Sequence, residues 1–314
     1  MRGFDTAPAV QGGWGYAPGT FGELVQGQWE DIPYLVTLPI HWGTRARFIA
    51  GDDDRVEVFP PYRQKARQAA ELACRLLGKP GGWLSLSSVL PLGKGLASSS
   101  ADVVAAMRAV AVTYGSQINP SRMAEMAAQI EPSDGVMYPG VCAFDVMRGR
   151  LLERFGPTPR AVIVGILGPG RVNTVAHHHE RIRYSAAQQA QLMEAIEVLR
   201  QAVPRGDWEG IGRAGRISAD VELERSPHDA LLSDVLEIAD REHWGVVIAH
   251  SGTARGFLFG SEAVHGSVIH RAIAALSQLN RGPVYRFSTW SGKVPVSGRL
   301  KVQQYGHSGM DYIR

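Results

Sequence analysis

The stretch VLPLGKGLASSSADVVAAMRA, residues 89–109, joins the end of an expected strand to the start of an expected helix. It combines Gly93 and Gly95 with three consecutive serines, Ser98 to Ser100, at the point where the helix begins. A helix needs only one N-cap residue, so capping does not explain three serines. A glycine-rich turn lets backbone N–H groups approach an anion, and a helix N-terminus adds about half a positive charge. The stretch therefore predicts a phosphate-binding loop, with a simple capped helix as the alternative.

Several well-known motifs do not fit this stretch. The Walker pattern places its lysine after the last glycine, whereas Lys94 precedes Gly95. A dinucleotide fingerprint requires glycine or alanine where Ser98 stands, and an acidic residue about 20 positions later, which the sequence lacks. The H-R-D and D-F-G elements of protein kinases are absent, as is a G-x-S-x-G elbow of a serine hydrolase around the serines.

The composition is that of an ordinary globular protein. The chain has 314 residues, of which 45% are hydrophobic and 20% charged, and this length allows one large unit or two domains. No stretch approaches the roughly 20 apolar residues that span a bilayer. The net charge of +3 is small and the basic residues are scattered, so we expect neither nucleic-acid nor membrane binding.

The cysteines and the N-terminus indicate a cytoplasmic protein. Cys74 and Cys142 are too few for a disulfide framework, and residues 1–13 contain no apolar run typical of a signal peptide. The triplet His177, His178 and His179 resembles a metal tract. Adjacent side chains diverge, however, so we expect a polar loop or helix entry there instead of a metal site.

Hydrophobic periodicity predicts alternating strands and helices along the whole chain. In the first half, the expected strands are 34–40, 44–50, 55–59 and 83–90, and the expected helices are 62–78, 99–114 and 121–130. In the second half, the expected strands are 161–167, 245–251, 255–260 and 283–290, and the expected helices are 184–203, 208–221, 228–243 and 262–278. We expect Ser121 to cap its helix and Pro132 to end it. The pattern favours two mixed units, 1–156 and 157–314, divided at the turn-rich stretch 156–160.

The segment Pro91-Leu92-Gly93-Lys94-Gly95-Leu96-Ala97-Ser98-Ser99-Ser100-Ala101 resembles the phosphate-binding motif of the GHMP kinases, P-x-x-x-G-L-G-S-S-A-A. It departs from that motif at Ala97 and Ser100, which replace glycine and alanine. Residues 16–27 (YAPGTFGELVQG) are similar to the first motif of the superfamily, and residues 249–257 (AHSGTARGF) to its third, in degenerate form. The resemblance implies an α+β fold with an N-terminal domain like ribosomal protein S5 domain 2, which contains a left-handed crossover, and a ferredoxin-like C-terminal domain.

Three short elements resemble the L-threonine kinases of cobalamin synthesis and propanediol use. They are residues 19–27 (GTFGELVQG), 131–134 (EPSD) and 250–253 (HSGT). This resemblance implies a cytoplasmic kinase that uses ATP and Mg²⁺ to phosphorylate the side-chain hydroxyl of a hydroxy amino acid, with L-threonine first and serine or homoserine as alternatives.

The resemblance also assigns roles to residues. Asp134 would orient or deprotonate the acceptor hydroxyl. The nucleotide site would comprise Pro91, Gly93, Lys94, Gly95, Leu96, Ala97, Ser98, Ser99 and Ser100. Ser98 and Glu131 would bind Mg²⁺, which prefers oxygen ligands. The acceptor would contact Thr20, Glu23, Asp134, Ser251, Gly252 and Thr253.

Two points of this assignment remain open from the sequence. Thr20 stands where the first superfamily motif has a lysine, so Asp134 lacks that lysine as an activating partner. The degenerate third motif also leaves a catalytically inactive binding protein as an alternative. Arg45 and Arg255 are candidates for binding the acceptor carboxylate.

Overall fold

The long strand β1 (Gly12–Trp29) lies in the middle of a mixed sheet of eleven strands. The computed structural model describes residues 11–170, 183–292 and 295–300. The strands follow the order β10, β7, β9, β8, β1, β2, β4, β3, with β11 beside β1, and with β5 pairing both β2 and β6. The remaining strands are β2 (Ile32–Ala50), β3 (Val56–Phe59), β4 (Gly82–Ser88), β5 (Val141–Asp145), β6 (Arg150–Gly156), β7 (Ala161–Leu167), β8 (Gly245–Ile248), β9 (Ala254–Gly260), β10 (Val284–Ser288) and β11 (Ser297–Arg299).

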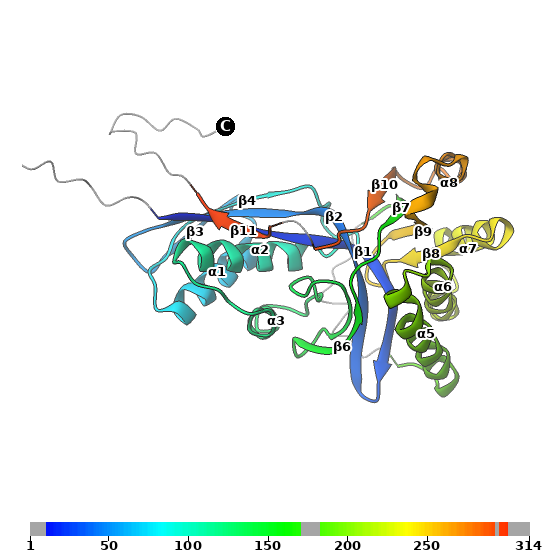
Figure 1. The fold of residues 1–314 in the computed structure, drawn as a ribbon, viewed down its shortest axis with the longest axis horizontal. Helices are drawn as coiled ribbons and strands as arrows, with labels where there is room; N and C mark the ends of the chain where they lie inside the picture. Colours follow the sequence, from blue (N-terminus) through cyan, green and yellow to red (C-terminus); the bar gives the residue numbers. More distant parts are fainter. Residues whose placement is uncertain (1–10, 171–182, 293–294, 301–314) are drawn as a thin grey trace, which may run out of the picture.

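The helices form two groups, one toward each end of the sheet (Figure 1). The first group contains α1 (Gln64–Leu77), α2 (Ser98–Thr113) and α3 (Pro120–Ala128). The second contains α5 (Ala186–Arg205), α6 (Trp208–Arg225), α7 (Ala230–Glu242) and α8 (Ser267–Gln278), with the short helix η1 (Ser261–His265) before α8. Strands β1 and β2 run between the groups. The predicted mixture of helices and strands is confirmed, while the division at residue 156 stays a prediction.

Glycine allows α2 to lie directly on β1. A Cβ atom at Gly15 would lie 2.3 Å from the carbonyl oxygen of Ala105, and one at Gly13 would lie 2.4 Å from Val112 Cγ1. Glycine within a strand marks such a close approach of another backbone. The packing buries nearly all of α2 and fixes the position of its N-terminus relative to β1.

Several predicted elements are corrected in detail. The two strands expected at 34–40 and 44–50 are one strand, β2, paired with β1 along most of its length. Helix α3 begins earlier than predicted, because Asn119, not Ser121, accepts the capping hydrogen bond from the Arg122 N–H group and Pro120 occupies the first helical position.

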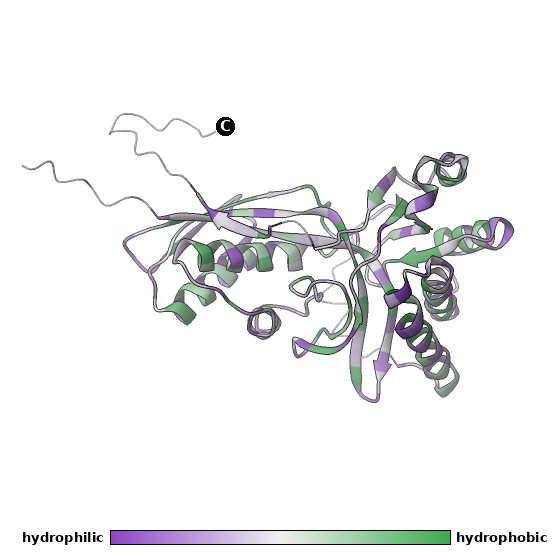
Figure 2. Cartoon of the chain, viewed as in Figure 1, coloured by the Kyte–Doolittle hydropathy of each residue, from purple (hydrophilic) through white to green (hydrophobic). Residues whose placement is uncertain are grey.

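One hydrophobic cluster extends through both helix groups. It includes Val104 of α2, Leu24 of β1 and Leu199 of α5. Figure 2 shows hydrophobic residues along α1 and α2, and more hydrophilic residues on α5. None of the helices in the described part of the chain is long and apolar enough to cross a membrane.

Candidate active site

The predicted phosphate loop, residues 91–97, leads into the first turn of α2. Gly93 and Gly95 have φ angles of 69° and 80°, and Ala97 has a φ of 56°. These left-handed conformations turn the chain sharply and are most easily adopted by glycine. No side chain among the described residues caps the helix at Ala97. The N–H groups of the first turn are therefore directed toward a position that an anion can occupy.

Strand β1 holds one side of this loop through its backbone. The Thr20 N–H group donates to the carbonyl oxygen of Leu96, and the Gly22 N–H group donates to that of Gly95, both at 3.2 Å. The Leu96 side chain is buried and anchors the loop in the core. The first and second predicted motifs therefore lie side by side, although about 70 residues separate them along the sequence.

The turn after β8, residues 249–254, holds the other side. The Thr253 N–H group donates to the carbonyl oxygen of Lys94 at 3.2 Å. A Cβ atom on Gly252 would lie 2.4 Å from that oxygen, and one on Gly95 would lie 2.3 Å from the Ala249 Cβ. The two backbones are thus in direct contact, which explains why glycine occupies both positions. The third predicted motif also meets the phosphate loop.

Lys94 and Thr253 share a further contact at the end of β7. The Lys94 ammonium donates to the carbonyl oxygens of Gly168 and Gly170 at 2.6 and 2.7 Å, and the Thr253 hydroxyl donates to Gly168 at 3.1 Å. The neighbouring Ser251 is buried in the same turn. These contacts keep a cation and two hydroxyl side chains beside the loop.

The serines at the start of α2 contact the two carboxylates of the 131–134 segment. The Ser99 hydroxyl donates to Glu131, whose other oxygen forms an ion pair with Lys65 of α1. The hydroxyl beside Glu131 is thus that of Ser99. The sequence predicts that Ser98 shares a metal with Glu131, but Ser98 is the buried first residue of the helix. The geometry brings a hydroxyl and a carboxylate together at the helix N-terminus.

Asp134 lies against the same helix turn. The Ser100 hydroxyl donates to Asp134 Oδ2 at 2.9 Å, and its oxygen accepts the Asp134 N–H group at 3.0 Å. Burial raises the pKa of Asp134 to about 7, and the nearby carboxylate of Glu23 contributes to the increase. A carboxyl group with a pKa near neutrality can gain and lose a proton under ordinary conditions.

Comparison with known proteins agrees with this geometry. Residues 64–144 match the family described as the GHMP kinases N terminal domain. The fold superimposes on homoserine kinase from Cytophaga hutchinsonii with a TM-score of 0.72 at 17% identity, covering 96% of this chain and 100% of that one. This chain therefore resembles the GHMP kinases in the sequence of its N-terminal part and in its fold. The resemblance expected from the sequence and the expected fold class are therefore confirmed.

Two curated proteins that are similar to this chain are L-threonine kinases. The protein from Citrobacter freundii is 26% identical over 257 residues, which cover 77% of this chain and 84% of the relative. The protein from Salmonella typhimurium is 24% identical over 250 residues, covering 77% of this chain and 81% of the relative. In both alignments the similarity extends well beyond the N-terminal domain match.

Thr20 and Glu23 are buried on β1. The Thr20 hydroxyl makes no hydrogen bond to any residue that the structure describes. Glu23 Oε2 accepts the His250 N–H group at 2.9 Å and lies 3.2 Å from His250 Nδ1. An unpartnered buried hydroxyl is unusual in a protein interior. Together with the charge of Glu23, it gives this strand segment the chemistry of a polar binding site.

Arg255, one of the two arginines considered for the acceptor carboxylate, is committed elsewhere. Its NH1 group donates to three backbone carbonyls of the 249–254 turn, and its NH2 group donates to Asp229 at 2.7 Å. Five donors in a fixed fork suit such a role. Arg255 therefore shapes the 249–254 turn and is not placed to bind a substrate carboxylate.

Arg45 lies on the opposite face of the sheet from α2. Its neighbour Thr44 donates a hydrogen bond to Asp102 of α2, so alternation along β2 directs Arg45 the other way. There its guanidinium lies 4.9 Å from the centre of the Trp14 ring. This expectation is also corrected, because Arg45 faces away from the phosphate loop.

The oxygen groups at the start of α2 fit a magnesium ion shared with a nucleotide. Among the residues that the structure describes, no three His, Cys, Asp or Glu side chains gather as a complete metal site. Magnesium is commonly held by one or two protein oxygens together with water and substrate phosphates. Glu131 and the adjacent serine hydroxyls provide such ligands. His177, His178 and His179 lie outside the described residues.

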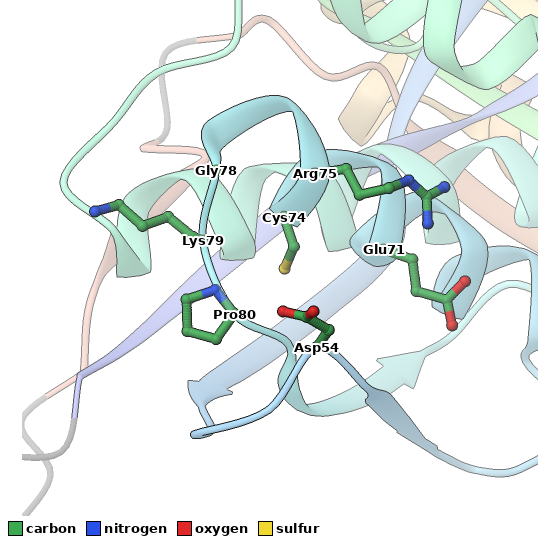
Figure 3. A pocket seen from close by; sticks show the side chains of 7 residues that line it. All are labelled: Asp54, Glu71, Cys74, Arg75, Gly78, Lys79 and Pro80. Carbon is green, nitrogen blue, oxygen red and sulfur yellow. The ribbon is translucent and has the colours of Figure 1, made fainter.

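A separate surface hollow lies at the other end of α1 (Figure 3). Its lining comprises Asp54, Glu71, Cys74, Arg75, Gly78, Lys79 and Pro80. Lys65, which contacts Glu131, is at the start of α1, whereas Gly78 follows its last residue. At 1.5 Å per residue, the helix separates the two places by roughly 20 Å. The hollow is not part of the phosphate site.

Two residues at the site were not predicted from the sequence. Lys65 lies outside the recognised motifs, and its ion pair with Glu131 depends on how α1 packs beside α2. His250 belongs to the HSGT element, but only the three residues after it were expected to contact a substrate. The only feature of the sequence that could have indicated a role for residue 250 is that a histidine stands in the HSGT element.

Proposed function

We propose that this chain is an ATP- and Mg²⁺-dependent kinase that phosphorylates the side-chain hydroxyl of a hydroxy amino acid, with L-threonine as the acceptor. The observation that carries the proposal is the position of Asp134, which is hydrogen-bonded to the first turn of α2, the helix that follows the phosphate loop. A carboxylate so placed can serve a hydroxyl that attacks a phosphate bound at the helix N-terminus.

The loop residues hold the nucleotide phosphates in this proposal. Backbone N–H groups from Gly93 to Ser99 donate to the phosphate oxygens, and Lys94 adds positive charge. Glu131 and a hydroxyl of Ser98 or Ser99 would hold the magnesium ion, which would neutralise charge on the phosphates.

The transfer step is a displacement at the terminal phosphorus atom. The acceptor oxygen forms the new O–P bond while the bond from phosphorus to the bridging oxygen breaks, and ADP leaves. Asp134 accepts the hydroxyl proton. Its pKa of about 7 suits a base that works near neutral pH.

The acceptor contacts in this proposal come from two segments. Thr20 and Glu23 lie on β1, and Ser251, Gly252 and Thr253 lie in the turn that packs on the phosphate loop. Support for L-threonine comes from the two L-threonine kinases that resemble this chain over 77% of its length. Serine and homoserine have the same reacting group and are the direct competitors.

A panel of acceptors tests the proposal. ADP release is measured with ATP, Mg²⁺ and L-threonine, L-serine, L-homoserine, galactose or mevalonate. We expect the highest kcat/KM with L-threonine and no release with the last two. Turnover of galactose or mevalonate without turnover of any amino acid would contradict the proposed acceptor class, and no turnover at all would favour a binding protein.

A further inference from the structure

A buried chain of hydrogen bonds connects β1, the turn after β8, and α6. Glu23 Oε2 accepts the backbone N–H group of His250 and faces its ring atom Nδ1 at 3.2 Å. His250 Nε2 lies 2.9 Å from the Ser218 hydroxyl oxygen. The exposed fractions are 2% for Glu23, 6% for His250 and 1% for Ser218. The motif assignments above give the histidine and the serine no role.

The hydrogen-bond partners determine which ring nitrogen carries the proton. Ser218 Oγ accepts the backbone N–H group of Gln26 at 3.1 Å, so its own proton is available for His250 Nε2. The carboxylate of Glu23 can only accept, so it takes the proton on Nδ1. A neutral imidazole satisfies both contacts, and burial lowers the pKa of His250 to about 4, which keeps the ring neutral.

The order of atoms resembles that of a serine hydrolase triad, but Ser218 is not placed as a nucleophile. Its oxygen already accepts the backbone N–H group of Gln26, and it lies on α6 on the other side of the His250 ring from Glu23. Of the three residues, Glu23 is the one on the same strand as Thr20, beside the phosphate loop. The hydrogen bonds therefore run from Ser218 to His250 and from His250 to Glu23. In this arrangement His250 orients the Glu23 carboxylate.

We infer that His250 is a positioning residue for Glu23, held in one tautomer by Ser218, and that the carboxylate so oriented binds the amino group of the acceptor. The inference rests on the proposed function. Two N–H groups on one oxygen fix the carboxylate and favour its charged form. A charged carboxylate attracts an ammonium group and accepts its N–H bonds, which a neutral acid does less well.

Glu23 also connects this chain to the catalytic carboxyl group. Its negative charge is, after burial, the largest contribution to the raised pKa of Asp134. In threonine, the amino and hydroxyl groups are on adjacent carbon atoms, so neighbouring carboxylates can serve one group each. Among the described residues, the charged or titratable groups near Glu23, His250 and Asp134 include Glu131, Tyr184, Glu222, Arg225 and Arg255.

Variants at His250 and Ser218 separate positioning from general stability. His250→Leu removes the ring contact to Glu23, whereas His250→Asn keeps a donor near the position of Nδ1. We expect His250→Leu to raise the KM for L-threonine about 10-fold or more, as expected when a hydrogen bond to a charged group is lost. His250→Asn should stay within about threefold, and His270→Leu, at an exposed site on α8, should match the unaltered enzyme.

Two further measurements distinguish this role from a purely structural one. Wild-type enzyme should prefer L-threonine strongly over 3-hydroxybutyrate, which lacks the amino group, and His250→Leu should lose most of that preference. If the Glu23 carboxylate moves away from Asp134 in this variant, the acidic limb of the kcat profile should move to lower pH, because the repulsion that raises the pKa of Asp134 falls. ATP affinity, measured by calorimetry without acceptor, should not change.

A second variant keeps the inference testable if His250→Leu does not fold. In Ser218→Ala, we expect a smaller rise in the KM for L-threonine and a shift of the kcat profile in the same direction. An unchanged KM and pH profile in folded variants, with wild-type turnover of L-threonine, would overturn the inference and leave the proposed function intact. Absence of amino-acid turnover by the wild-type enzyme would overturn both.

Discussion

Burial and a residue distant in the sequence are the two largest causes of the raised pKa of Asp134, and Glu131 of the same EPSD element adds to them. Burial is the largest cause and the charge of Glu23 the next, while the Ser100 hydroxyl opposes them. The EPSD element alone is equally compatible with an ordinary polar turn, in which aspartate is common. The contact with the first turn of α2 is what supports the proposed catalytic role, and that contact joins residues 34 positions apart.

Replacement of Asp134 by asparagine tests its role as a base. We expect kcat to fall about 100- to 10,000-fold, because removal of a positioned base typically has that effect. ATP affinity should stay near that of the wild-type enzyme, and wild-type kcat should rise as the pH passes about 7, where Asp134 becomes ionised. Steady-state kinetics and calorimetry provide these values.

A matched control for this variant is Glu125→Gln, an exposed position on α3. It should leave kcat unchanged. If Asp134→Asn retains kcat within a few-fold of the wild-type value, Asp134 is a turn residue, and the hydroxyl proton is transferred to phosphate or water.

The same pKa shift predicts a pH-dependent effect on stability. The folded-state pKa of about 7 exceeds the ordinary value of 3.8, so the folded state binds the proton more tightly. The contribution of protonated Asp134 to the free energy of unfolding is therefore largest at low pH and is lost as the pH rises through 7. Asp134→Asn should raise the melting temperature at pH 8 more than at pH 5. An equal change at both pH values would contradict the assigned pKa.

At the scale of elements, the helices and most central strands follow from hydrophobic periodicity, whereas β1 does not. Its sequence GGWGYAPGTFGELVQGQW is rich in glycine and contains a proline, both of which are typical of loops. The structure explains these residues, because Gly13 and Gly15 leave room for α2. The requirement comes from a helix about 90 residues later in the chain, so no local pattern could reveal it.

The packing of the phosphate loop predicts that alanine will affect ATP binding differently at two glycine positions. Gly95 and Gly206 both have positive φ angles, but only at Gly95 would a Cβ meet neighbouring atoms. Gly95→Ala should weaken ATP binding at least about 10-fold, because the loop must move away from the 249–254 turn. Gly206→Ala should cost only about 1 kcal/mol of folding stability for its left-handed conformation and leave ATP binding unchanged.

Calorimetric titration with ATP and thermal melts measure the two effects separately. Equal ATP affinity in the Gly95→Ala and Gly206→Ala proteins would show that the contact between the loop and the turn is not needed for nucleotide binding.

At the scale of the whole molecule, the site is formed by parts from both ends of the sequence. Residue Glu23 of β1 pairs with Ile248 of β8, and one hydrophobic cluster includes residues of both helix groups. The motif order along the chain indicated the family, but the convergence of the three motifs depends on the topology of the sheet. The pairing of β1 with both halves is what brings them together.

This shared core predicts cooperative unfolding. Because α5 and β8 both pack against β1, loosening either half would expose apolar surface of the other. We expect a single calorimetric transition whose van't Hoff and calorimetric enthalpies agree. Two separated transitions would show that the units 1–156 and 157–314 are thermodynamically independent.

The most direct test of the proposed function is the proton-coupled ³¹P NMR spectrum of a reaction of the chain with ATP, Mg²⁺ and L-threonine. Transfer to the side-chain oxygen places the phosphorus three bonds from a single hydrogen atom, so we predict a new phosphomonoester doublet that grows in proportion to ADP. A spectrum that gains only the singlet of inorganic phosphate, or does not change, would contradict the account.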